Sequence, residues 1–223
     1  MEHSRTRPSR KRKQVEYLGM DSGESHDKDT NGSDRKGPAV AIEKQLQKHP
    51  RRNSDGEYIF SDYPSFRPNM SPEEVLRAGS FGGTYFRPIY SSVTHKQYKD
   101  EAWKELPSPW LEGIDIKTLV TSKIYRKKVN TYQVECGQGL EAWEKSGWIT
   151  EADPYGWFQW YCRFFQGRRC SDDDRQIARG LGVMGPTGRW RSNLAKKCLQ
   201  SSHPMAQAVD DMALSPKVRQ LLQ

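Results

Sequence analysis

Apolar positions are densest between Asp153 and Gly167, where they surround most of the circumference of a helix. The positions concerned are Trp157, Phe158, Trp160, Tyr161, Phe164 and Phe165. Asp153 is a favourable N-cap residue, Pro154 suits a first helical turn, and Gly167 stands where the chain should leave the helix. A helix that is apolar on almost every side belongs in the middle of a core. The pattern therefore predicts a central helix over residues 154–166.

Two amphipathic segments follow this aromatic one. The first, DDDRQIARGLG, places Ile177 and Leu181 on one side, and the second, GRWRSNLAKKCLQ, carries Trp190, Leu194 and Leu199 at positions that can face the core. The order of helix, glycine-bearing turn and helix has the spacing of a helix-turn-helix unit. An ordinary helical hairpin on a basic protein has the same spacing, so both interpretations stay open.

Three consecutive carboxylates, Asp172, Asp173 and Asp174, open the first of these segments directly after Ser171. The helix dipole stabilises negative charge in the first turn by roughly 0.3–1 kcal/mol per residue. The carboxylates could instead bind a divalent cation, but the sequence offers no second carboxylate cluster to complete a coordination shell. Capping is the preferred interpretation, and we predict no metal site.

Aromatic residues and prolines are interspersed over residues 58–90, a pattern typical of extended, wrapping chain. One short helix is indicated inside it, with Ser71 as N-cap and two glutamates in the first turn. Gly79, Gly82 and Gly83 follow. A glycine-rich loop can hold phosphate, but no Lys-Ser or Lys-Thr pair comes after these glycines, so a tight turn is expected.

The pattern is weaker between this region and the aromatic helix. Residues 94–106 have helical spacing and end at a proline. Residues 114–134 mix β-branched with basic residues, and strand and helix stay open there. A short helix carrying Leu140 and Trp143 is expected after the glycines that break the chain.

Residues 1–55 are rich in Ser, Asp, Gly, Lys and Arg and almost free of aromatic residues. Such a segment cannot bury enough apolar surface to offset the entropy of ordering, so it is predicted to be a disordered basic and polar tail, with a transient helix at residues 39–49. The whole pattern predicts a mainly α protein: this tail, one small helical domain over residues 56–200 around the central aromatic helix, and a C-terminal extension over residues 201–223.

Composition narrows the class of partner. The chain has 223 residues, a formal net charge of +8 and a mean hydropathy of −0.94. Between residues 155 and 200, nine basic residues face three acidic ones. This balance favours polyanionic partners through counterion release. No apolar window suits a signal peptide or a membrane span, so we expect a soluble, intracellular protein without a membrane partner.

The cysteines form no CxxC pair and have no histidine at ligand spacing, so we expect reduced thiols and no zinc site. They are Cys136, Cys162, Cys170 and Cys198. Cys136, in VECGQGLE, could be a nucleophile with His95 or His203 as base. The sequence shows neither a nucleophile elbow nor an oxyanion signature. An enzyme of unknown class is therefore the least favoured reading, and we predict no catalytic residue and no cofactor.

The basic positions around the last two predicted helices form a candidate nucleic-acid interface. In a helix-turn-helix unit the second helix enters the major groove, and phosphates are contacted from its ends. The predicted contact residues are Arg168, Arg169, Arg179, Arg189, Arg191, Asn193, Lys196 and Lys197. We therefore expect a protein without enzymatic activity that binds nucleic acid mainly through phosphates.

A short basic cluster in the tail is of the nuclear-localisation type and comprises Arg10, Lys11, Arg12 and Lys13. It predicts a nuclear, or nuclear and cytoplasmic, protein, although a solvated charge run without a receptor has the same composition. A third function class also stays open. An intracellular adaptor could bind another protein through the aromatic and Pro-rich residues 58–90.

The segment GWFQWYCRFFQGRR, followed by DDRQIAR and GRWRSNL, resembles one shared by uncharacterised proteins of fungi and other microbial eukaryotes. The resemblance extends over about residues 79–199. It implies an intracellular eukaryotic protein, and it implies neither an activity nor a catalytic residue.

Overall fold

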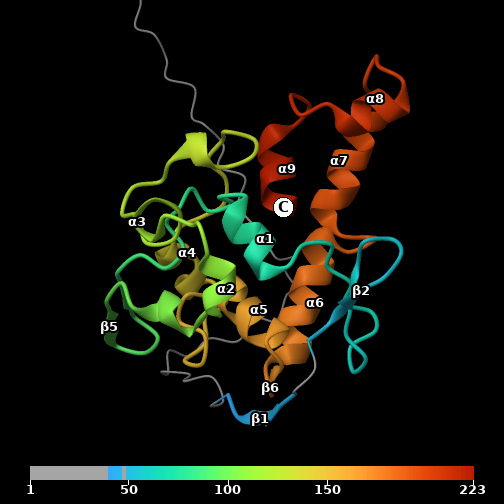
Figure 1. The fold of residues 1–223 in the computed structure, drawn as a ribbon. Helices are drawn as coiled ribbons and strands as arrows, with labels where there is room; N and C mark the ends of the chain where they lie inside the picture. Colours follow the sequence, from blue (N-terminus) through green and yellow to red (C-terminus); the bar gives the residue numbers. More distant parts are fainter. Residues whose placement is uncertain (1–39, 47–48) are drawn as a thin grey trace, which may run out of the picture.

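The computed structural model describes residues 40–46 and 49–223 (Figure 1). Its strands form three two-stranded antiparallel sheets. The pairs are β1 (Ile42–Gln45) with β6 (Arg168–Cys170), β2 (Arg51–Arg52) with β3 (Tyr58–Ile59), and β4 (Ile89–Ser91) with β5 (Lys96–Tyr98).

The helices of the described residues are mostly short. They are α1 (Pro72–Arg77), α2 (Ser108–Leu111), α3 (Ile116–Leu119), α4 (Leu140–Lys145), α5 (Trp157–Phe165), α6 (Asp173–Met184), α7 (Arg189–Leu199), α8 (Met205–Asp210) and α9 (Pro216–Leu222), with 3-10 turns at Ala102–Glu105 and Lys127–Val129. Helices hold about 40% of the described residues and strands 9%. The prediction of a mainly α, single helical domain is therefore wrong. The long segment before α5 packs its aromatic rings through turns, short strands and single helical turns, so much of the core is built without regular helices.

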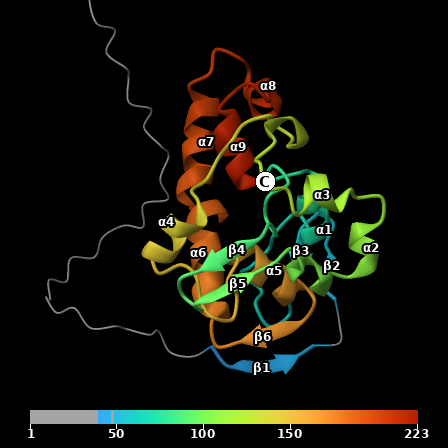
Figure 2. The ribbon, with the colours of Figure 1, turned by 90° about the vertical axis from the view of Figure 1, so that its left-hand side faces the viewer.

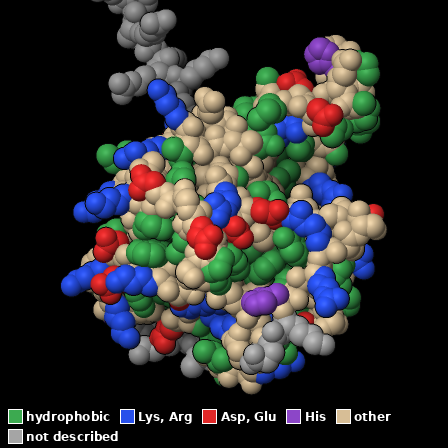
Figure 3. Space-filling model, viewed as in Figure 1, with side chains coloured by type: hydrophobic (Ala, Val, Ile, Leu, Met, Phe, Trp, Pro, Cys, Tyr) green, Lys and Arg blue, Asp and Glu red, His purple; other side chains and the backbone are tan. Residues whose placement is uncertain are grey.

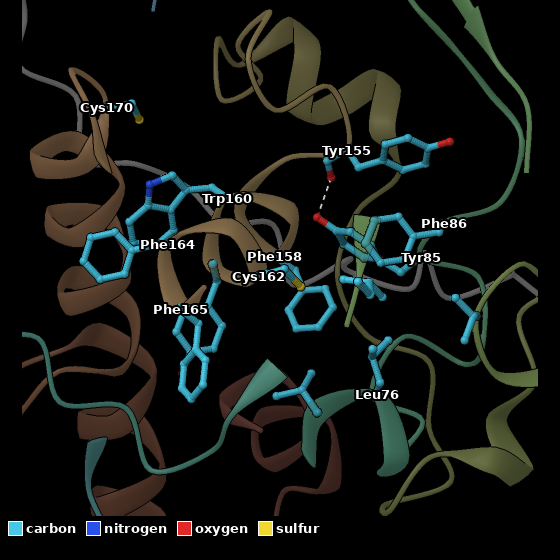
Figure 4. Packing of buried hydrophobic residues seen from close by; sticks show 14 of the residues in the cluster. Leu76, Tyr85, Phe86, Tyr155, Phe158, Trp160, Cys162, Phe164, Phe165 and Cys170 are labelled. Atoms are coloured by element: carbon cyan, nitrogen blue, oxygen red, sulfur yellow. Dashed lines mark hydrogen bonds between the residues drawn. The ribbon is translucent and has the colours of Figure 1, made fainter. Parts of the chain in front are cut away.

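The aromatic helix α5 lies at the centre of the core, as its pattern predicted. Trp160, Cys162 and Phe164 are completely buried. Figure 4 shows Trp160 and Phe164 on one side of α5 and Phe158 on the other, near Tyr85, whose ring centroid is 4.9 Å from that of Phe158. The Tyr85 hydroxyl donates to the Tyr155 carbonyl oxygen at 2.6 Å. The core is thus an aromatic cluster in which buried polar tips are hydrogen-bonded.

The start of α5 differs from the prediction. The helix begins at Trp157, after Gly156 with φ 91°, and Asp153 is not its N-cap. The carboxylate of Asp153 is instead fully buried and paired with arginines. The end was predicted correctly, since Gly167 follows the C-cap residue with φ 98°. A side chain at Gly167 would overlap the carbonyl of Leu46, so glycine is required where β1 passes.

The strand β1 corrects the expectation of a disordered tail to residue 55 with a transient helix at 39–49. Ile42 pairs with Cys170 and Lys44 with Arg169, at the lower edge of the molecule in Figures 1 and 2. All four side chains of β1 are exposed, so backbone hydrogen bonds hold the strand. The expected nuclear-localisation cluster, residues 10–13, lies outside the described residues.

Among the shorter elements, α1 was predicted correctly and has a capping box. Ser71 Oγ accepts from the Glu74 backbone N–H, and the Glu74 carboxylate accepts from the Ser71 backbone N–H. The short helix expected at Leu140 is also confirmed as α4. The helix expected over residues 94–106 is wrong, because that chain forms β5 and a 3-10 turn.

The last helices correct the helix-turn-helix interpretation. In both ribbon views α7 leads on from the end of α6 instead of lying across it. The tight turn between them is closed by a hydrogen bond from the Gly188 N–H to the Gly185 carbonyl, at 2.9 Å. Trp190 is buried as predicted, but Leu199 is 69% exposed and does not face the core. The helices α8 and α9 then turn the chain back, so that α9 packs against α7.

Candidate nucleic-acid interface

Arg168, one of the predicted phosphate contacts, is inside the protein. Its Nη1 and Nη2 atoms donate to Asp153 Oδ1 and Oδ2 at 2.8 and 2.7 Å. Asp153 Oδ1 also accepts from Arg163 Nη1 at 2.9 Å. The charge of Arg168 is thus matched by a buried carboxylate, so this residue is not available to nucleic acid and the prediction is wrong for it.

Arg169 is also buried and does not belong to a surface. Its Nε and Nη2 atoms donate to Asp62 at 2.8 and 3.2 Å. Its guanidinium lies 3.8 Å from the ring centroid of Phe164. The hydrogen bond from Arg169 also holds the pKa of the Asp62 carboxyl below its usual value. Arg169 therefore joins β6 to the segment after β3.

Arg179 is half-buried against an aromatic ring. Its guanidinium lies 4.7 Å from the ring centroid of Trp148 and donates to the Trp148 carbonyl oxygen at 3.2 Å. Burial lowers its pKa to about 10, so it keeps its proton at neutral pH. Arg175, one turn earlier, is paired with Asp172. Neither arginine of α6 presents an open guanidinium for a phosphate.

The four cations of α7 remain exposed: Arg189, Arg191, Lys196 and Lys197. The guanidinium of Arg189 lies 5.3 Å from the Trp190 ring centroid. Within the described residues, Arg191, Lys196 and Lys197 make no ion pair and no side-chain hydrogen bond. These four positions therefore survive as candidate phosphate contacts.

The arrangement of these cations is spread out. Successive residues of a helix are turned by about 100°, so Arg189 and Lys196, seven positions apart, share one flank of α7 while Arg191 lies on the other. Ser192 and Leu199 lie between the two flanks. Charge therefore surrounds the outward side of α7 without forming one continuous basic face.

Asn193, another of the predicted contact residues, is only partly exposed. Its Oδ1 atom is buried and accepts no hydrogen bond from the described residues. The amide is thus not displayed on the outer side of α7, and the prediction for this residue is not supported by its position. The surviving candidate surface consists of cations alone.

The charge balance around α7 is one-sided. From residue 175 to residue 209 the chain has six basic residues and no Asp or Glu. Two of the six, Arg175 and Arg179, are engaged by Asp172 and Trp148. The other four belong to α7, which lies in a stretch of sequence without Asp or Glu.

A second set of cations lies on a loop whose fold the sequence left undecided. We call residues 122–128 the basic loop. Its cations are Lys123, Arg126, Lys127 and Lys128, and all four are exposed. The signal was visible in the sequence as four basic residues within six positions, but only the fold shows that they are exposed and, among the described residues, make no ion pair.

Two of the three carboxylates at the start of α6, Asp172 and Asp173, are engaged by the protein, whereas Asp174 is exposed. Asp173 Oδ1 accepts from Trp160 Nε1 at 2.8 Å, and Asp173 Oδ2 accepts from the Cys170 backbone N–H at 2.9 Å. Asp172, not Ser171, is the N-cap residue. In the described part of the chain no group of three or more His, Cys, Asp or Glu side chains is placed to hold a metal ion.

Cys136 lacks the surroundings of an activated nucleophile. Burial raises the pKa of its thiol to about 11, and nearby Glu135 adds to the shift. His95 and His203 are exposed and, in the described structure, form no hydrogen bond with Cys136. The geometry gives no support to nucleophilic catalysis at this position.

The aromatic rings proposed for protein binding are mostly core residues. Phe60, Phe66 and Phe86 are each 3% exposed or less. Tyr90, 58% exposed, is the exception among the large apolar residues of 58–90. It lines an open hollow of about 720 Å³ between β4 and α4. The adaptor interpretation therefore loses most of the residues on which it depended.

No family model, curated protein or solved structure matches the chain. The resemblance to proteins of microbial eukaryotes stays a prediction. Within the described residues, no helix has the length and apolar character that crossing a membrane requires.

Proposed function

We propose that the protein binds nucleic acid through contacts between phosphates and the exposed cations of α7. The observation that carries the proposal is the stretch from residue 175 to residue 209, which has no acidic residue and displays Arg189, Arg191, Lys196 and Lys197. Exposed cations in a stretch of sequence without acidic residues favour a positive potential, which attracts polyanions and releases their counterions.

The expected binding is largely independent of sequence. Phosphate contacts position a protein on nucleic acid but carry no base information. The cations lie on both flanks of α7, and Asn193 is turned partly inward, so the helix does not present one face of polar side chains to a groove. We therefore expect similar affinities for unrelated sequences.

The experiment is fluorescence anisotropy with the full chain, a labelled DNA duplex and a labelled single strand, over a series of salt concentrations. If each of the four cations meets a phosphate, log affinity falls with log salt by about 0.9 per contact on duplex DNA. Replacing Arg189, Arg191, Lys196 and Lys197 together by Gln should then flatten the slope by about three to four units.

A matched control removes the same charge elsewhere. Arg51, Lys96, Lys99 and Lys104 are exposed on β2, on β5 and in the chain that follows it, and their replacement by Gln also lowers the net charge by four. This control should keep most of the slope. Absence of binding by the intact chain at low salt, or an equal loss in both variants, would reject the proposal for α7.

A second candidate, protein binding, is favoured by a different surface. Figure 3 shows apolar side chains on the projection that carries α8. Met205, Val209 and Met212 are 45%, 51% and 53% exposed. Exposed methionines adapt to varied apolar partners. A pull-down with nuclease treatment tests this candidate, since a protein partner should persist after nuclease and be lost when these three residues are replaced by Ser.

We also propose that the protein is nuclear, or nuclear and cytoplasmic. The basic cluster at residues 10–13 and the overall net charge of +8 support this localisation.

A further inference from the structure

We propose that the basic loop, residues 122–128, is a second phosphate-binding surface that contacts the same nucleic acid as α7. This inference rests on the proposed function, because it assigns the polyanion the same chemistry. Lys123, Arg126, Lys127 and Lys128 are exposed, and none of them makes an ion pair or side-chain hydrogen bond with the described residues. Four exposed cations within six positions give this loop a dense local positive charge.

Three glycines of another segment pack directly against the basic loop and the chain on either side of it. Gly79, Gly82 and Gly83 all have positive φ values, of 62°, 57° and 82°. A Cβ atom at Gly79 would overlap the Val129 carbonyl oxygen, one at Gly82 would lie 2.6 Å from the Tyr125 ring, and one at Gly83 would overlap the Thr118 carbonyl oxygen. The turn GSFGG therefore does not cradle an anion itself. It lets the segment that bears the cations approach its backbone directly.

Hydrogen bonds fix the conformation of the loop where it packs on these glycines. The Arg126 backbone N–H donates to the Gly82 carbonyl at 3.0 Å, and Ser122 Oγ donates to the Ile124 carbonyl at 2.8 Å. Asn130 Nδ2 donates to the Tyr125 hydroxyl at 2.9 Å. The backbone from which the cations project is thus held in place before any ligand arrives.

This preorganisation distinguishes the basic loop from an ordinary run of surface lysines. Ordering a mobile loop on binding costs conformational entropy, and a loop that is already held avoids most of that cost. A held backbone therefore favours binding of a polyanion by these cations.

The basic loop and α7 lie on opposite sides of α9. Both ribbon views place α9 between α7 and the 3-10 turn Lys127–Val129. The Tyr132 backbone N–H donates to Gln220 Oε1 at 3.2 Å, which fixes α9 to the chain after the loop. A nucleic acid is a polyanion long enough to contact both surfaces across α9.

An anionic membrane is the competing partner, because Ile124 is 71% exposed among the four cations. One aliphatic side chain is a weak membrane anchor, and stable peripheral binding needs a larger apolar surface. The small apolar surface of the basic loop therefore favours nucleic acid over a membrane.

The test replaces Lys123, Arg126, Lys127 and Lys128 together by Gln in the full chain. Their side chains are exposed and unpaired within the described residues, so the thermal midpoint should stay near that of the wild type. In the anisotropy assay with the labelled duplex, the salt slope should flatten by about three to four units. The control variant at Arg51, Lys96, Lys99 and Lys104 should change it far less.

Combining the loop and α7 variants separates the two proposals. A slope that depends on α7 alone would overturn the basic-loop proposal and leave the proposed function standing. A slope that depends on the loop alone would reject α7 as the interface. The protein should not bind vesicles containing phosphatidylserine tightly. Vesicle binding that Ile124→Ser abolishes, with no loop-dependent binding of the duplex, would assign the basic loop to a membrane surface and overturn this proposal.

Discussion

Asp153 and Arg168 form a two-pronged ion pair in the interior, with both guanidinium Nη atoms donating to the carboxylate at 2.8 and 2.7 Å. Replacing Asp153 by Ala leaves the charge of Arg168 buried without its partner. We expect a loss of roughly 3–5 kcal/mol in the free energy of unfolding. Urea denaturation of the two proteins measures it.

The double variant Asp153→Leu with Arg168→Met supplies the control for this pair. Removing both charges avoids the unpaired guanidinium, so the double variant should be more stable than Asp153→Ala. An exposed ion pair offers the comparison: Lys104→Ala, next to Glu101, should cost at most about 1 kcal/mol. Equal costs for the buried and the exposed pair would contradict the structure.

Trp160 is a core position where replacement should cost much of the protein's stability. It is completely buried, and its Nε1 donates to Asp173. Trp160→Ala should lower stability by roughly 3–5 kcal/mol, and Trp157→Ala by less because Trp157 is only partly buried. Thermal melts of both variants provide the measurement, and an unchanged midpoint for Trp160→Ala would show that the ring is not in the core.

Asp62 should make the free energy of unfolding depend on pH in the acidic range. Its pKa in the folded protein is held down by the hydrogen bonds from Arg169, so the unfolded chain binds its proton more readily. The stabilisation is present above the unfolded pKa, near 4, and is lost as the pH falls toward the folded pKa.

Asp62→Asn should therefore cost about 1–3 kcal/mol at neutral pH, with the difference from wild type shrinking below about pH 4. Melts over a pH series test this. Asp55→Asn, at an exposed turn, is the control and should change neither stability nor its pH dependence. A constant difference across the series would mean that the ion pair with Arg169 does not form.

The cysteines should be unreactive in the native protein. Burial raises the pKa of Cys136 to about 11, and Cys162, Cys170 and Cys198 are buried. At pH 8 we expect iodoacetamide to leave the native chain mostly unmodified, while the unfolded chain takes up one adduct at each of its four cysteines. Mass spectrometry reads the result. Rapid labelling of native Cys136 would restore the enzyme hypothesis.

The localisation proposal is tested by removing residues 1–13 from a fluorescent fusion. If Arg10, Lys11, Arg12 and Lys13 direct nuclear import, the shortened fusion should shift toward the cytoplasm. The matched control replaces the four basic residues by Gln in the full-length fusion. Identical distributions of all three fusions would remove this signal from consideration.

The sequence predicted the elements whose cause is local. The aromatic periodicity of α5 and the cap at Ser71 depend on residues a few positions apart, so both could be recognised. The strand β1 could not, because its side chains are exposed and its partner is far along the chain. The predicted fold class was wrong for the same reason, because the segment before α5 gains its structure from packing on that helix.

Only the fold shows which of the predicted cations are exposed to a ligand and which are buried in ion pairs. Arg168 and Arg169 look like surface charges in the sequence, but their partners are Asp153, 15 residues away, and Asp62, 107 residues away. No local pattern identifies such pairs. The cations of the basic loop were visible, yet the packing of the three glycines against the loop joins segments that are separate in the sequence.

The pairing of β1 with β6 also constrains when the protein can fold during its synthesis. The Ala41 backbone N–H donates to Ser171 Oγ across 130 residues of chain. The ribosome makes the first strand long before its partner, and α5, the centre of the core, also comes late in the sequence. The early aromatic segments therefore lack their main packing partner until α5 has left the exit tunnel. We therefore expect most of the core to form late in synthesis, after α5 has emerged.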